Sequence, residues 1–132
     1  MSLESSWTDM GRGIGIRATM KLPNAQNALV EEDKIRTYLL DPEHQFGSSK
    51  ARFFTAFGFT LDNWQALADA LLAHGRTHDV TRTRETGFGP RYEIEGAMLS
   101  PDGRNPLVRC VWQLDKGEIA PRLITAYPIQ KL

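Results

Sequence analysis

The spacing of apolar residues changes near the middle of the chain, and this change constrains the fold more than any other feature. Across residues 31–75, apolar side chains recur every three to four positions, as on one face of an amphipathic helix. From Arg91 onward they alternate with charged ones, as in Tyr92, Glu93, Ile94 and Glu95. Helices followed by strands predict an α+β fold, with about three N-terminal helices packed on a C-terminal antiparallel sheet of three to four strands.

Local signals predict the bounds of these elements. Helices are expected over residues 31–40, 48–57 and 61–74. Residues that cap or end helices lie at their limits: Ser48 or Ser49 and Thr60 at starts, and Pro42, Gly58 and Gly75 at ends. Strands are expected over residues 92–98, 107–114 and 123–127, with a weaker one over 79–84. Turn sequences at residues 101–103 and 115–117 favour a meander.

Length and charge point to one ordinary globular domain. The 132 residues are expected to form a flexible N-terminal arm (1–21), with a short strand at 14–18, and a single α+β domain (22–132). Sixteen basic and sixteen acidic residues cancel, so a polyanion would have to meet a local patch. One cysteine excludes an internal disulfide.

The N-terminus shows no signal peptide, and no apolar run reaches the roughly 20 residues that span a bilayer. We therefore expect no membrane segment. The chain is expected to be cytoplasmic, or to be exported without a cleaved N-terminal signal.

The segment 39–59 holds the first candidate residues for chemistry. His44 lies between two predicted helices, where it could serve as an acid/base or a phosphate-binding imidazolium. It could equally be a loop histidine that caps helix ends or packs on Tyr38. Lys50 and Arg52 fall in the first turns of the next helix, where an anion is favoured, although a solvated face is the plainer interpretation.

The strands hold the second group of candidates. Arg109 lies opposite to the apolar face of its strand, and Thr125 and Tyr127 share a face of the last strand. Together they could bind a phosphate if the register brings them close. The stretch 74–91 is locally basic, which fits a solvated edge. Standard metal, P-loop and serine-nucleophile motifs are missing, so we expect no metal and no cofactor, and a metal-independent acid/base mechanism if the protein is an enzyme.

Several blocks of sequence resemble a small bacterial domain family of uncharacterised function. They are LPNAQNA (22–28), YLLDPEH (38–44), KARFF (50–54), VRCVW (108–112) and PRLITAYP (121–128). Members of that family occur alone and as C-terminal modules of toxin-like and phage-derived proteins. The domain in turn resembles the barnase–EndoU–colicin–RelE-like class of small ribonucleases.

This resemblance implies a metal-independent ribonuclease that cuts RNA through the ribose 2′-hydroxyl, with RNA as substrate and a cognate immunity protein as partner. It implies these site residues: His44, Lys50, Arg109 and Thr125 as catalytic, and Arg52 and Tyr127 as substrate-binding. The family commonly has proline after the histidine, where this chain has Gln45. The alternative is a non-catalytic binding or adaptor domain that uses the same groove for a peptide or anionic ligand. An immunity-type partner is a third hypothesis.

Overall fold

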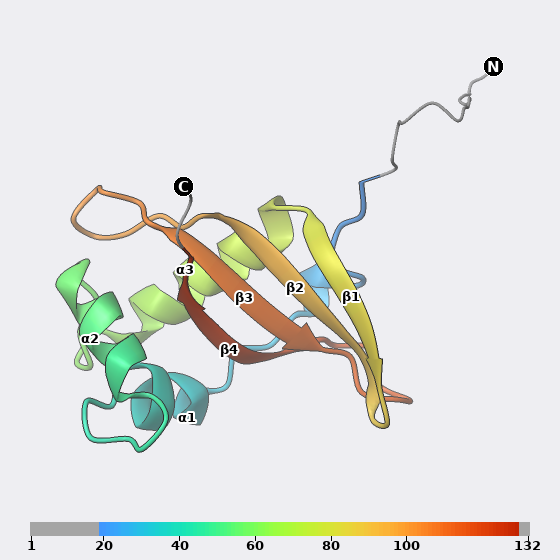
Figure 1. The fold of residues 1–132 in the computed structure, drawn as a ribbon, viewed down its shortest axis with the longest axis horizontal. Coiled ribbons are helices and arrows are strands. Elements are labelled where there is room, and N and C mark those ends of the chain that lie inside the picture. The colour runs from blue at the N-terminus through green and yellow to red at the C-terminus, as the bar shows by residue number, and fades with distance from the viewer. Residues whose placement is uncertain (1–18, 130–132) are drawn as a thin grey trace.

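The computed structural model describes residues 19–129, which form an α+β domain (Figure 1). The α-helices are α1 (Glu32–Lys34), α2 (Ser48–Ala56) and α3 (Trp64–Thr77), with a 3₁₀ turn, η1 (Ala25–Asn27), before α1 and a π-helical segment, η2 (Ile35–Leu39), directly after it. The strands are β1 (Val80–Thr86), β2 (Gly89–Ala97), β3 (Leu107–Gln113) and β4 (Arg122–Pro128). The predicted α+β class, with helices before an antiparallel sheet of four strands, is confirmed. The single helix expected over residues 31–40 is not, because this stretch forms the short α1 followed by η2.

The sheet is an antiparallel meander in the order β1-β2-β3-β4, as the tight turns predict. Its register places Ile94 opposite Cys110 and Cys110 opposite Ala126, so these three apolar side chains share one face. Helix α3 packs on this face against β2 and β3, whereas α2 and η2 lie beyond the β4 edge (Figure 1). In the described part of the chain, no helix covers the other face of the sheet (Figure 1).

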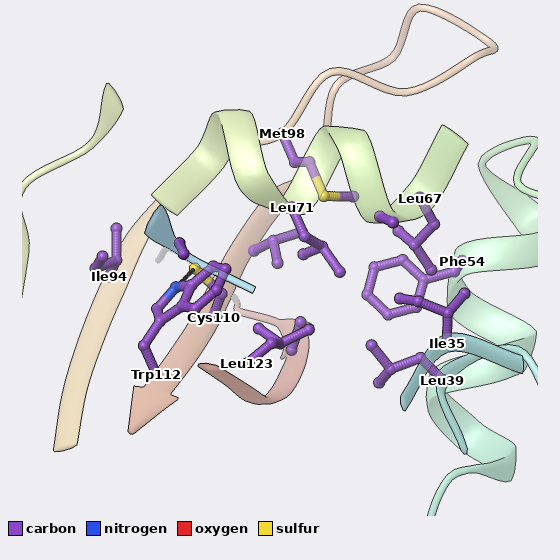
Figure 2. Packing of buried hydrophobic residues seen from close by; sticks show 14 of the residues in the cluster. Ile35, Leu39, Phe54, Leu67, Leu71, Ile94, Met98, Cys110, Trp112 and Leu123 are labelled. Carbon is purple, nitrogen blue, oxygen red and sulfur yellow. Dashed lines mark hydrogen bonds between the residues drawn. The ribbon is translucent and has the colours of Figure 1, made fainter. Parts of the chain in front are cut away.

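The core lies between α3 and the sheet and continues under α2 and η2 (Figure 2). Cys110 and Trp112 from β3 meet Leu71 from α3, and Phe54 from α2 packs near Ile35 at the other end. All five side chains are fully buried. Burial on this scale is the main favourable contribution to folding, and it sets how the helices dock on the sheet.

The end of α2 agrees with the expectation that Gly58 stops it. Gly58 has a φ of 102°, a conformation that residues with a Cβ rarely adopt, and its N–H donates to the Thr55 carbonyl at 3.0 Å. The predicted serine cap at the start of α2 is wrong. Gly47 occupies the N-cap position and no side chain caps the helix there.

The expected stop of α3 at Gly75 is also wrong, because the helix continues to Thr77. A Cβ on Gly75 would lie 2.7 Å from Cζ2 of the buried Trp112. The glycine therefore allows the helix to approach the sheet closely, and the need for it comes from a contact that local sequence does not show.

The described part of the N-terminal segment is tied to the start of β1. The Val80 N–H donates to the Met20 carbonyl at 2.7 Å, and Lys21 forms an ion pair with Asp79 at 2.8 Å. The predicted strand at 14–18 and the rest of the predicted arm up to residue 18 lie outside the described residues. Between residues 19 and 129, no helix is long and apolar enough to cross a membrane.

Candidate functional site

A groove with a volume of about 620 Å³ lies between the first helical segment and β4. Its lining comes from α1 and η2, from the loop before α2, and from the middle of β4. The lining residues are Glu31, Asp33, Lys34, Thr37, Tyr38, His44, Phe46, Ile124 and Thr125. Two of the six predicted site residues, His44 and Thr125, thus line one groove although 81 positions separate them in the sequence.

Tyr38 organises this groove. It lies in η2, where the Leu40 N–H reaches back five residues to the Ile35 carbonyl at 2.8 Å; such π-helical turns are frequent at functional sites. The Tyr38 hydroxyl is 2.9 Å from Thr125 Oγ1, which joins the helical segment to β4. The His44 ring packs edge-on against Tyr38 at 5.1 Å between centroids. Tyr38 therefore positions both Thr125 and His44, the two predicted site residues that line the groove.

His44 is held by the backbone of its own loop. Its Nδ1 accepts hydrogen bonds from the N–H groups of Phe46 and Gly47, each at 3.0 Å. In this geometry the proton of the neutral ring is on Nε2, which can donate to a ligand. The capping and packing roles considered for this histidine both occur, because His44 orders the turn before α2 and contacts Tyr38.

Two carboxylates in the groove were missed by the sequence reasoning. Glu31 and Asp33 lie at the start of the first helix, where acidic side chains suit the helix dipole, yet both line the groove. Among residues 19–129, neither forms an ion pair. The spacing of Asp33 and Thr37, four residues apart and so on one helix face, was the available signal. The groove therefore holds carboxylate acceptors as well as the His44 donor.

Arg109 lies on the helix-free face of the sheet, opposite Tyr127 in the register. Its Nε donates to Glu95 Oε2 at 2.7 Å, and its Nη1 donates to the Tyr127 hydroxyl at 3.2 Å. These two partners, Tyr127 first and Glu95 second, raise the pKa of the guanidinium above its ordinary value. Arg109 is thus already paired, and neither it nor Tyr127 lines the groove.

The two basic residues of α2 lie in different places. Lys50 Nζ is 5.5 Å from the centre of the Tyr38 ring and donates to the Phe46 carbonyl at 3.3 Å, so it contacts two lining residues of the groove. Arg52 lines a separate, mostly apolar hollow of about 680 Å³ beside Pro42 and Leu61. The structure therefore places Lys50 beside Tyr38 and Phe46 of the groove, whereas Arg52 lines the other hollow.

A buried polar network occupies the core side of the sheet. The His74 Nε2–H donates to the Gly96 carbonyl at 3.0 Å, which leaves Nδ1 to accept from the Cys110 thiol at 3.0 Å. The Trp112 indole N–H donates to Cys110 Sγ at 3.0 Å. Burial lowers the pKa of His74 and raises the pKa of the Cys110 thiol to about 12. His74 is thus a neutral core residue rather than part of a basic surface.

Within the part of the chain that the structure describes, no group of three or more His, Cys, Asp or Glu side chains is arranged to hold a metal ion.

Comparison with known proteins gives a fold relative and a family. No curated protein matches the sequence. A solved structure titled "Contact-dependent growth inhibition toxin - immunity protein complex from Klebsiella pneumoniae 342" contains a chain with the same fold, at a TM-score of 0.63 and 15% identity, over 82% of this chain and 98% of that one. A family model matches residues 21–130, and the chain therefore belongs to the family described as a domain of unknown function, DUF6883.

Proposed function

We propose that this domain is a toxin-related module that cuts RNA without a metal ion, by attack of the ribose 2′-hydroxyl on the adjacent phosphate. The observation that carries the proposal is the set of groups that line one groove: the His44 ring and the carboxylates of Glu31 and Asp33. Transesterification needs one group that accepts a proton and one that donates a proton. A chain in a solved toxin–immunity complex has the same fold, and this similarity of fold supports a toxin-related role.

The proposed reaction assigns one role to each group. Glu31 or Asp33 takes the proton of the 2′-hydroxyl, whose oxygen then attacks phosphorus and expels the 5′-oxygen as the cyclic phosphate forms. His44 gives a proton to that leaving oxygen. To do so it must first be protonated at Nδ1, which breaks the two hydrogen bonds from Phe46 and Gly47. Substrate binding must therefore reshape the loop before α2.

Positive charge for the phosphate would come from two lysines beside Tyr38. Lys34 Nζ is 5.2 Å and Lys50 Nζ is 5.5 Å from the centre of its ring. Arg109, a catalytic residue according to the family resemblance, would have to exchange Glu95 for the phosphate. Thr125 would support the bound phosphate from the wall of the groove and Tyr127 from beside Arg109.

The test is incubation of RNA with the protein in the presence of a chelator. We expect cleavage that leaves 2′,3′-cyclic phosphate ends, and a loss of rate of about 10²–10⁴-fold in His44→Ala. Glu31→Gln and Asp33→Asn, made singly and together, identify the base. Glu32→Gln is the matched control, because Glu32 pairs with Arg36 and does not line the groove. Uncut RNA with the wild-type protein, or equal cleavage by His44→Ala, would refute the proposal.

The second candidate is a binding module without turnover. It is favoured by the resting geometry, in which Nδ1 of His44 and the guanidinium of Arg109 are both satisfied by the protein itself. Such a groove would form a stable complex with an oligonucleotide or peptide. Persistent binding by the wild type, with no cleavage products and weaker binding in Tyr38→Ala, would favour this candidate over the enzyme.

A further inference from the structure

Among residues 19–129, no strand pairs with the outer edge of β1, and this edge has the properties of a docking site. β1 is the first strand in the sheet order, so β2 pairs with only one of its sides. It lies at the edge opposite to β4 (Figure 1). The groove is beside β4, because Ile124 and Thr125 of that strand line it. Residues 81–85 are exposed on both faces, and the described N-terminal segment pairs with the edge only at Val80. An edge of this kind can accept a further strand.

The register identifies which backbone groups face outward. The Pro90 carbonyl accepts from the Leu114 N–H, so the backbone of Pro90 is directed to β3. Glu85 is opposite Pro90 in the register, and Thr83 is two residues further along β1. Because hydrogen-bonded and non-hydrogen-bonded pairs alternate along an antiparallel ladder, Thr83 and Glu85 present their N–H and C=O groups to the free edge.

Two arginines flank Thr83 on this strand; Arg82 has Glu93 opposite it in the register, whereas Arg84 does not face a carboxylate. Arg82 and Arg84 alternate along the strand and so share the helix-free face of the sheet. Arg84 is directly opposite Arg91, and like charges in that position are destabilising unless an anion balances them. Arg91 uses Nε to bond Gln113 at 3.0 Å. Across residues 19–129, Arg82 and Arg84 form no ion pair.

We propose that the β1 edge binds an extended, acidic strand of a partner protein, whose carboxylates lie beside Arg82 and Arg84. A polypeptide strand can complete the backbone ladder at Thr83 and Glu85, which a nucleic acid cannot do regularly. A second copy of this chain, paired edge to edge, would set its arginines against these arginines. This site does not depend on the proposed ribonuclease activity, because the groove lies at the other edge.

The experiment uses two synthetic probes and backbone amide NMR of the protein. One eight-residue peptide alternates Glu with Val, and the other alternates Lys with Val. We expect the acidic peptide to shift the amides of Thr83 and Glu85 and to bind about tenfold more tightly than the basic one. The double variant Arg82→Glu, Arg84→Glu should reverse that order.

Thr83→Pro separates strand addition from simple charge attraction. It removes an outward N–H and leaves the bonds to β2 intact, so it should abolish binding of the acidic peptide, whereas Thr83→Ala should retain it. Equal affinity for both peptides, unchanged binding in Thr83→Pro, or equal shifts of these amides by an oligouridylate would overturn the proposal. So would a dimer of the free protein that forms through this edge. If melting shows that Thr83→Pro is unfolded, the charge-reversal variant decides.

Discussion

Replacing Gly75 by alanine should destabilise the fold, although alanine is the better helix former. Gly75 lies within α3, two residues before its end. A Cβ there would be 2.7 Å from Cζ2, 2.9 Å from Cε2 and 3.0 Å from Nε1 of Trp112. Trp112 is fully buried and its indole N–H is bonded to Cys110, so the ring cannot move aside without losing that bond.

The magnitude follows from two opposing contributions. In a helix interior, alanine is favoured over glycine by about 1 kcal/mol. An extra carbon forced into a packed core costs about 1–3 kcal/mol, and three contacts at or below 3.0 Å place this site near the upper end. We therefore expect a net loss of about 2 kcal/mol in the free energy of unfolding, which is a decrease in Tm of about 8 °C.

Urea unfolding measured by far-UV circular dichroism checks this value, and near-UV circular dichroism reports the packing of Trp112. The slope of free energy against urea should stay unchanged if only stability has altered. Ala73→Gly is the control for helix propensity, because Ala73 is on the exposed face of the same helix. It should lose about 1 kcal/mol without a change in the near-UV spectrum.

A double-mutant cycle locates the effect. In a Trp112→Phe background the smaller ring relieves the overlap, so Gly75→Ala should cost about 1–2 kcal/mol less than in the wild type. A neutral or stabilising effect of Gly75→Ala in the wild-type background would refute this reasoning. Gly75 would then be an ordinary helical glycine, and α3 would not lie as close to the sheet as described.

Three further predictions concern buried and half-buried groups. Burial lowers the pKa of His74 below its ordinary value of 6.5, so on acidification the unfolded chain takes up a proton before the folded one does. The free energy of unfolding should therefore be highest above pH 6.5 and should fall as the pH drops below that value. His74→Gln should reduce this loss, as urea unfolding at several pH values would show. Because Cys110 is buried with a thiol pKa of about 12, iodoacetamide should modify it only after unfolding, as mass spectrometry would show. Tyr38→Phe should lose about 1 kcal/mol of stability in urea unfolding, because it removes the bond to Thr125, whereas Tyr127→Phe should leave the groove unchanged.

The candidate site was only partly predictable, because its geometry depends on pairings between distant segments. The pattern placed His44 in a loop and Thr125 on a strand, but the bond between Tyr38 and Thr125 depends on how η2 docks on β4. The pairing of Arg109 with Glu95 follows from the register of β2 on β3, which single-strand alternation does not supply. The carboxylates at Glu31 and Asp33 were missed because a helix start explains them equally well.

The sequence by itself determined the kinds of element, their order and most of their limits, because period and turn chemistry are local properties of the chain. A helix must bury its apolar stripe and a strand its alternate residues, so the change of period was enough to indicate an α+β meander. Only the tertiary structure decided that Gly75 is a packing residue and His74 a core residue, since both meet β3 side chains 36 or 37 positions away in sequence. It likewise decided that one edge of the sheet borders a groove while the other has no partner strand among the residues that the structure describes, because an edge exists only once all the strands have been ordered.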